Sequence, residues 1–425
     1  MAQHMKHQKT SLESTDDSSE DDDRQQTQIY AKDSMDRFGD DLCQLLLSNL
    51  SLKNRFVFQC MSKQFRRTVF RSVVDIDVRD ELIKGNYNTM TPIIATMNKV
   101  IKKCQNIETI DFRGLEDSNQ YILEVLPEIR HKIPKLREIY CDLMSNSERW
   151  VRQLAPLVTR VGNHLSSQKE SLIHCNRLSE LRVENLAEVF DTTSGQLLAK
   201  NLRSFWLKGS ANSEQLSAFL AGNQCLRFLL IKIHNLESLT QFGHQLSQLP
   251  QLRVLVIRLR HFDQSLNDSL RTIGVNCKQL TILALKLGTK TTEINVQTLD
   301  SLEMFGRLRQ LELALIGSNT QSFDLLIPGK RLINLMIQCS QIDCKLLGNC
   351  HKQWPRLQYL DFECQEFNDK CLDHILRLRT LQTLVIQCDH NIDLLDNDFC
   401  DLLATNPNLK NIEINANNEK KFYCR

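Results

Sequence analysis

The sequence predicts an α/β solenoid, in which about twelve strand–turn–helix units follow a small module of three helices. Three observations predict it: an aliphatic pattern that recurs along most of the chain, helical spacing between its copies, and few loop-forming residues. The chain has 425 residues with 14 Gly and 8 Pro. These are about 3% and 2%, well below the usual ~7% and ~5%. Such a composition indicates short connections between many ordered elements.

The recurring pattern is an aliphatic residue, a second one three positions later, and a third one five positions after the first. From Leu178 onward its copies start 24 to 28 residues apart, within the 20–29 residues typical of leucine-rich repeats. A single unit cannot bury its apolar face, but a stack of units buries a continuous core, so residues 73–416 are predicted to form the solenoid. The copies start at Ile107, Leu178, Leu202, Leu226, Leu252, Leu280, Leu308, Leu332, Leu357, Leu381 and Leu409, with a weaker one at Leu136 and a first one at Val73.

Between the copies, apolar residues have helical spacing, as in Leu216/Phe219/Leu220 and Leu239/Phe242/Leu246. One gap, from Leu136 to Leu178, is longer than a repeat. An extra helix over roughly 146–164 is predicted there. Its apolar face would consist of Trp150, Leu154, Leu157 and Val161. Residues 417–425 are predicted to be a C-terminal tail.

Residues 1–34 are predicted to be a disordered acidic leader. They hold four Lys/Arg and eight Asp/Glu, whereas the rest of the chain has a net charge of +6. The stretch SLESTDDSSEDDD has almost no apolar side chain to bury and cannot offset the entropy of ordering. Ser18 and Ser19 directly precede four acidic residues, a setting that acidophilic kinases favour; a purely solubilising tail is the alternative.

Composition and motifs exclude several classes of function. No stretch of ~18 uncharged apolar residues could span a membrane, and the first residues lack a secretory apolar region. The 15 Cys therefore indicate reduced thiols in a cytosolic or nuclear protein. No phosphate-binding loop, H-E-x-x-H or G-x-S-x-G motif is present, so we expect no enzyme, cofactor or metal. Cys339, Cys344, Cys350 and His351 have a spacing that fits no common zinc site.

Residues 35–72 do not share the repeat. Leu42, Leu45, Leu46 and Leu50 have helical spacing, and Phe56/Cys60 and Met61/Phe65/Val69 give two further helical faces. Asp40 and Asp41 would stand at the start of the first helix, where carboxylates offset the helix dipole. Three helices in ~35 residues cannot bury a self-sufficient core, so the module is expected to need a partner. A cap on the end of the solenoid is the alternative.

The stretch FGDDLCQLLLSNLSLKNRFVFQCMSKQFRRTVF resembles an F-box. Followed by leucine-rich repeats, it makes residues 35–414 similar to the F-box/leucine-rich-repeat proteins, the substrate receptors of SCF ubiquitin ligases. Gly39 stands where the motif has Pro, a residue that in the family helps to set the start of the first helix. The other matching positions are Phe38, Asp41, Leu42, Leu46, Leu50 and Ser51 in the first half and Met61, Ser62, Lys63, Phe65 and Arg66 in the second.

The resemblance implies a non-catalytic receptor subunit of a ubiquitin ligase complex, acting in ubiquitin-dependent protein degradation in the cytoplasm, the nucleus or both. The module would bind a Skp-family adaptor and, through it, a cullin. Leu42, Leu46, Leu50 and Phe65 are expected to bury against each other and against the adaptor. The full set of adaptor-binding residues implied is Phe38, Gly39, Leu42, Leu46, Leu50, Met61 and Phe65.

The second, fourth and sixth residues after each first aliphatic residue are predicted to point away from the core. In the middle repeats the first two of these columns are apolar and the third is basic. Four cations at the ~4.8 Å strand spacing would form a ladder about 15 Å long. The predicted substrate-binding residues are Trp206, Lys208, Phe228, Leu230, Lys232, Val254, Val256, Arg258 and Lys286.

This surface favours a protein substrate with carboxylates or phosphates beside an apolar anchor. Two alternatives concern geometry: the chain's own loops could cover the face, or the strand register could differ by one residue. A protein-interaction module of the ribonuclease-inhibitor type, without a ligase, is the main functional alternative. Nucleic acid is disfavoured, because apolar columns adjoin the cations and the net charge beyond the leader is only +6.

Overall fold

The computed structural model describes residues 39–79, 91–113, 129, 131–143, 148–164, 169–209, 211–233, 239–260, 265–288, 296–316, 329–342, 344–368, 370–389, 396–416 and 419–425. The predicted acidic leader, residues 1–34, and Phe38 lie outside this range. The chain divides into two compact units, Met1–Val69 and Phe70–Arg425.

The first unit is helical. It contains α1 (Asp40–Ser48), α2 (Leu52–Val57), a short 3₁₀ helix η2 (Phe58–Cys60) and most of α3 (Lys63–Ser72), whose last turn belongs to the second unit. Helix α1 starts at Asp40, as expected, and extended Gly39 precedes it. The backbone N–H of Asn54 donates to the Ser51 side chain at 3.3 Å, which caps α2. Three α-helices therefore lie where the helical spacing predicted them.

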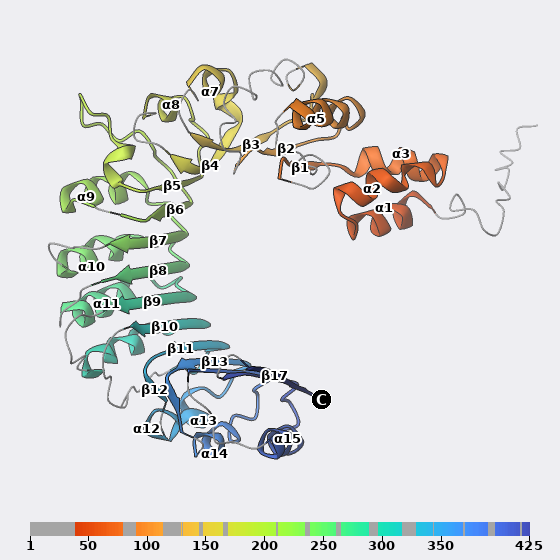
Figure 1. Ribbon diagram of the computed structural model, residues 1–425. Helices are drawn as coiled ribbons and strands as arrows, with labels where there is room; N and C mark the ends of the chain where they lie inside the picture. Colours follow the sequence, from red (N-terminus) through yellow and green to blue (C-terminus); the bar gives the residue numbers. More distant parts are fainter. Residues whose placement is uncertain are drawn as a thin grey trace, which may run out of the picture. The chain divides into compact units, whose positions relative to one another are not determined.

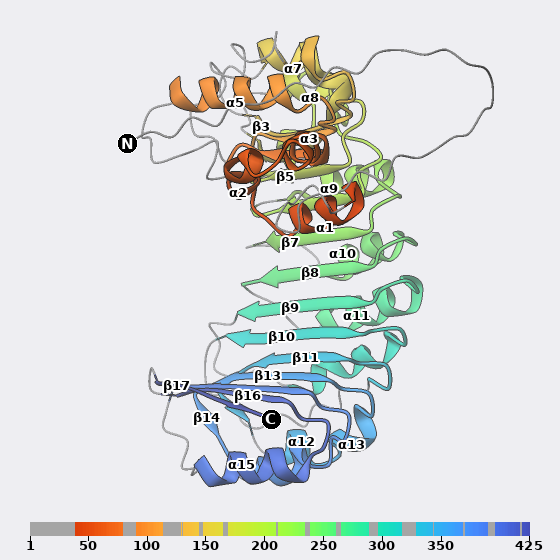
Figure 2. The same ribbon diagram turned by 90° about the vertical axis from the view of Figure 1, so that its right-hand side faces the viewer.

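The second unit is built on one long sheet, in which each strand up to β16 pairs in parallel with the next (Figures 1 and 2). Each parallel pair needs a crossover, and the crossovers carry the helices. The strands are β1 (Asp75–Asp77), β2 (Thr109–Asp111), β3 (Glu138–Leu143), β4 (Val158–His164), β5 (Glu180–Val183), β6 (Ser204–Leu207), β7 (Phe228–Ile233), β8 (Val254–Leu259), β9 (Ile282–Gly288), β10 (Gln310–Ile316), β11 (Asn334–Gln338), β13 (Tyr359–Cys364), β15 (Thr383–Cys388), β16 (Asn411–Ala416) and β17 (Glu419–Cys424).

The helices of this unit lie on one side of the sheet, as Figure 1 shows for α9, α10 and α11. We call the opposite surface of the sheet the strand face. The helices are α5 (Thr91–Lys103), α7 (Glu148–Leu154), η3 (Ala155–Leu157), α8 (Lys169–Ile173), η5 (Leu186–Val189), α9 (Ser213–Gly222), α10 (Leu239–Ser247), α11 (Ser265–Asn276), η6 (Val296–Met304), α12 (Cys344–Leu347), α13 (Cys350–Gln353), α14 (Cys371–Ile375) and α15 (Asp396–Thr405). A separate pair of short strands, β12 (Gln341–Ile342) and β14 (Glu366–Phe367), joins two successive repeats.

The core follows the recurring aliphatic pattern. In the repeat that contains β8, the three positions Leu252, Leu255 and Ile257 are fully buried, and the same three positions are buried in every clear copy. The cysteines three positions before a repeat, such as Cys104 and Cys277, are buried as well. The repeat length, the parallel register and the buried aliphatic positions together make this unit a leucine-rich-repeat solenoid.

One predicted helix is partly wrong. The helical segment expected over roughly 146–164 ends at Leu157, and Val158–His164 forms strand β4 between β3 and β5. Val161 pairs with Leu181, so this segment is a further repeat. Its pattern was not visible because the third position is Asn163 where other copies have an apolar residue.

The predicted C-terminal tail also has regular structure. Residues Glu419–Cys424 form β17, which pairs antiparallel with β16. Lys420 Nζ lies 2.6 Å from Glu413 of β16, and Tyr423 stacks on Phe399 with ring centroids 5.3 Å apart. Strand β17 thus pairs with β16, whose backbone groups on that side would otherwise lack ladder partners.

Candidate protein-interaction surfaces

The strand register brings the predicted substrate-binding residues of β6 to β9 into columns. Trp206 pairs with Leu230, Leu230 with Val256, and Phe228 with Val254. Their chain neighbours, such as Phe205 and Leu207, are fully buried, whereas Trp206 is only half-buried. The alternative register is therefore excluded, and these apolar side chains lie on the strand face. The loops that were the other alternative, as a possible cover of this face, follow β7, β8 and β9 and lie outside the described residues.

Trp206 is the largest side chain of this apolar patch, and it is held in place from two sides. Its ring lies 4.6 Å from the ring of Phe228, tilted by 35°. On the other side, the guanidinium of Arg182 lies 5.5 Å from the Trp206 ring, within the range of a cation–π contact. A half-buried aromatic residue in a fixed orientation is typical of a binding anchor.

The predicted ladder of cations has three members in register. Lys232 pairs with Arg258, and Arg258 with Lys286. Lys208 does not extend the ladder, because β6 ends at Leu207 and Lys208 Nζ contacts Glu184 at 3.3 Å. The chain turns at Gly209, where any Cβ would collide with the Glu184 carbonyl. None of the described acidic residues forms an ion pair with Lys232, Arg258 or Lys286.

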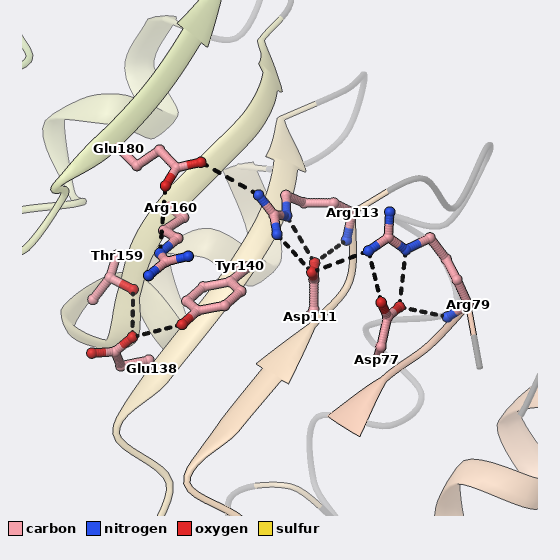
Figure 3. A network of polar contacts seen from close by, with 9 residues as sticks. All are labelled: Asp77, Arg79, Asp111, Arg113, Glu138, Tyr140, Thr159, Arg160 and Glu180. Carbon is pink, nitrogen blue, oxygen red and sulfur yellow. Dashed lines mark hydrogen bonds and ion pairs between the residues drawn. The ribbon is translucent and has the colours of Figure 1, made fainter. Parts of the chain in front are cut away.

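Towards the N-terminal repeats, the strand face is occupied by a paired-charge network that was not predicted (Figure 3). Arg113 donates to Asp111 through Nε at 2.9 Å and through Nη2 at 2.7 Å. Arg79 binds Asp77 in the same two-pronged way and also reaches Asp111 at 3.4 Å. Asp111 is only 8% exposed, and these two guanidinium groups stabilise its carboxylate in this buried position.

The network continues across β3, β4 and β5. Glu180 lies 3.5 Å from both Arg113 and Arg160, and Arg160 stacks over the Tyr140 ring at 4.4 Å. The Tyr140 hydroxyl donates to Glu138 at 3.0 Å. Burial raises the pKa of Tyr140, and its hydrogen bond to Glu138 acts in the same direction. A sequence signal did exist: Asp-x-Arg occurs at the same place in two successive repeats.

From β13 onward the strand face carries carboxylates, such as Asp361 and Glu413. Asp361 of β13 is buried and accepts from the Tyr359 hydroxyl at 3.1 Å and from Gln387 Nε2 at 3.3 Å. Burial raises the pKa of Asp361, and neighbouring Glu413 adds to this effect. Burial also raises the pKa of Tyr359 to about 12. We call the part of the strand face on β6–β9 the middle strand face; it lies between a region of paired charges on β1–β5 and an acidic region from β13 onward.

The helical unit has an exposed apolar face. Leu42 and Leu46 are each 42% exposed, so they do not bury against the rest of the unit as expected. Met61, another predicted adaptor-binding residue, is 50% exposed. Leu50 is half-buried. Helix α1 instead turns Cys43 and Leu47 inward, and Phe65 is only 3% exposed. Phe65 therefore belongs to the unit's own core. The sequence did not single out the exposed Leu45, Val57 and Phe58 as adaptor-binding residues.

No group of three or more His, Cys, Asp or Glu among the described residues could hold one metal ion. Burial raises the pKa of Cys350 to about 11 and that of Cys104 to about 12, which keeps both thiols protonated. None of the helices described is both long and apolar enough to cross a membrane.

No family model and no curated protein matches this chain. Similar solved structures include an internalin from Listeria monocytogenes, with 14% identity, a TM-score of 0.38 and coverage of 87% of this chain and 89% of that one. TLR13 in a complex with ssRNA13 has 13% identity and a TM-score of 0.38, covering 88% of this chain but only 53% of TLR13. The leucine-rich repeat-containing protein LegL7 from Legionella pneumophila has 12% identity and a TM-score of 0.39, covering 72% and 97%.

Proposed function

We propose that this protein is the substrate-recognition subunit of an SCF-type ubiquitin ligase. The helical unit binds a Skp-family adaptor and, through it, a cullin, and the middle strand face binds a protein substrate. The protein supplies no catalytic residue; it holds the substrate near the ubiquitin carrier, which is catalysis by proximity. It works in the cytoplasm or the nucleus, and its substrate carries acidic or phosphorylated residues beside an apolar anchor.

The exposed apolar face of the helical unit is the observation that carries this proposal. Leu42, Leu45, Leu46 and Met61 are 42–61% exposed in a unit of fewer than seventy residues. An apolar surface of this kind on a small unit is typical of a protein-binding site. Gly39, in place of the motif's Pro, adopts a φ of −63°, the value that a proline ring imposes. The F-box resemblance supplies the identity of the partner.

Leu46→Asp in the full chain is expected to weaken binding of a Skp-family adaptor at least tenfold, because a carboxylate would be buried in an apolar contact. Since Leu46 is 42% exposed in the free protein, folding should be unaffected. Gln44→Asp, an exposed change on the same helix, is the matched control and should bind normally. Surface plasmon resonance with a purified adaptor measures both; equal binding by Leu46→Asp would contradict the adaptor proposal.

A protein-interaction module without a ligase is the alternative, and the middle strand face favours it equally. In that case the adaptor would not bind wild-type protein, but proteins captured by the full chain would still depend on Trp206. Quantitative mass spectrometry of proteins captured by wild type and by Trp206→Ala distinguishes the two. The alternative would be supported if neither sample contained an adaptor and if specific proteins were captured by wild type but not by Trp206→Ala.

A further inference from the structure

A second charged surface lies at the edge of the sheet where strands β8 to β13 begin. A groove of about 990 Å³ is lined there by residues one to four positions before the start of successive strands. Six of the lining residues are basic, and none is acidic. We call it the basic groove; its six cations are Arg253, Arg307, Arg309, Lys330, Arg331 and Arg356.

The repeat itself builds this groove. The backbone N–H of Thr281 donates to the Arg253 carbonyl at 2.9 Å, and that of Arg309 donates to Thr281 at 2.8 Å. These bonds stack the strand-entry segments of neighbouring repeats at the ~4.8 Å strand spacing. Arg307, Arg331 and Arg356 occupy the same position in three repeats, directly before the first aliphatic residue. Their side chains therefore leave one edge of the sheet in a row.

The charge of the groove is not neutralised within the described part of the chain. All six basic side chains are exposed, and no described carboxylate forms an ion pair with any of them. Arg79 and Arg113 differ from these six cations, because each of them binds a carboxylate through two nitrogens. Repulsion between like charges in a row is a cost of this arrangement, and an anionic ligand would remove it.

The chemistry of the lining selects the class of ligand. Five of the six cations are Arg, whose planar guanidinium matches carboxylate and phosphate oxygens in pairs. The five strand entries span about 19 Å, which an extended peptide of about six residues would fill. The described lining includes no aromatic side chain on which nucleotide bases could stack. This favours a peptide over single-stranded nucleic acid.

We propose that the basic groove binds an extended segment of a partner protein that carries several carboxylates or phosphates. The site shares no residue with the middle strand face and does not depend on the proposed ligase function. A protein could therefore be held at two places, through an apolar anchor on the strand face and through an acidic segment at the edge. Two weak contacts on one ligand would raise the overall affinity through their effective concentration.

The test measures peptide binding to the full chain by fluorescence anisotropy in 50 mM salt. The probes are ten-residue peptides of alternating Ser and Glu, the same peptide with phosphoserine, a Lys-for-Glu version, and a ten-nucleotide single-stranded RNA. Arg309→Glu with Arg331→Glu should weaken binding of an acidic peptide at least 30-fold. Lys99→Glu with Lys102→Glu on α5 changes the net charge equally and should alter it less than twofold. Comparing the Glu and phosphoserine peptides identifies the preferred anion.

A second variant, Arg309→Gln with Arg331→Gln, removes the same two charges without adding acidic groups. It should still weaken binding about tenfold, and it tests the groove even if the charge-reversed variant does not fold. Trp206→Ala should leave peptide binding unchanged, which separates this site from the strand face. The proposal is overturned if the α5 control loses as much affinity as the groove variants, or if the Lys peptide binds as tightly as the Glu peptide. Tighter binding of the RNA than of either acidic peptide, lost in the groove variants, would also overturn it.

Discussion

The strand faces of β1–β5 and of β6–β9 are built on the same repeat but have opposite character. In β1–β5 the outward positions carry charges that neutralise each other, as Asp111 does with Arg113 at 2.7 Å. In β6–β9 the outward positions carry Trp206 and other apolar residues beside cations without a described partner. Because both faces rest on the same buried aliphatic core, this difference does not stem from folding the repeat. The charges of the first face are paired within the described chain, and we propose that the second face binds another molecule.

The largest expected effect tests whether the apolar side chains of β6 are divided between core and surface. Phe205→Ala should lower the free energy of unfolding by about 3–5 kcal/mol, because a fully buried aromatic ring leaves a cavity. Trp206→Ala should cost only about 1 kcal/mol, since the ring is half-buried and loses mainly its contacts with Phe228 and Arg182. Urea unfolding followed by circular dichroism measures both. Equal losses would show that Trp206 is part of the core.

The next effect concerns the paired-charge network. Asp111→Ala should lower the free energy of unfolding by about 2–3 kcal/mol, because it leaves Arg113 and Arg79 without their shared carboxylate in a partly buried site. Asp77→Ala is the matched control: the Asp77 side chain is 42% exposed, and its loss should cost less than about 1 kcal/mol. If both variants unfold at the same urea concentration, burial does not distinguish the two carboxylates.

These two regions also show what could be predicted from the sequence. The aliphatic positions were predictable because one side of every strand must be buried, which forces a period that recurs about every 25 residues. Strand β4 was missed because Asn163 interrupts that period. Lys208 was placed in the cation ladder because spacing alone does not show that β6 ends at Leu207. Side chains at the outward positions need not be buried, so no recurring pattern predicts their contacts. The sequence shows only which residue types stand there.

The basic groove, and the side of the first helix that packs inward, could not be predicted from the sequence pattern for a different reason. The groove combines three positions of the repeat, and equivalent residues are separated by about one repeat length along the chain, as Arg307 and Arg331 are. Only the stacking of strand entries brings them together. In the helical unit, helical spacing identified an apolar helix but did not decide which of Leu46 and Leu47 points inward. Both outcomes depend on packing partners distant in sequence.

A smaller, pH-dependent effect distinguishes Asp361 from the paired carboxylates, because its described hydrogen-bond partners are the uncharged Tyr359 and Gln387. Burial raises its pKa in the folded state, so the folded protein holds this proton more tightly than the unfolded chain does. Its contribution to stability is therefore greatest below its unfolded pKa and declines as the pH rises through the folded pKa. Asp361→Asn should be at least as stable as wild type at pH 7, and its advantage should shrink towards pH 4. Thermal melts across this range measure it; an advantage that grows towards pH 4 would contradict the sign.

The smallest effect tests whether the three cations of the middle face repel one another. Arg258 lies between Lys232 and Lys286 in register, so Arg258→Glu would replace two repulsive cross-strand pairs with two attractive ones. Stability should rise by about 0.5 kcal/mol in 50 mM salt, and the gain should vanish in 1 M salt, where the screening length is ~3 Å. Lys208→Glu, which opposes Glu184 instead of pairing with it, should show the reverse sign. A loss of stability in Arg258→Glu at low salt would mean that a carboxylate outside the described residues already pairs with this ladder, and the middle face would then resemble the N-terminal one.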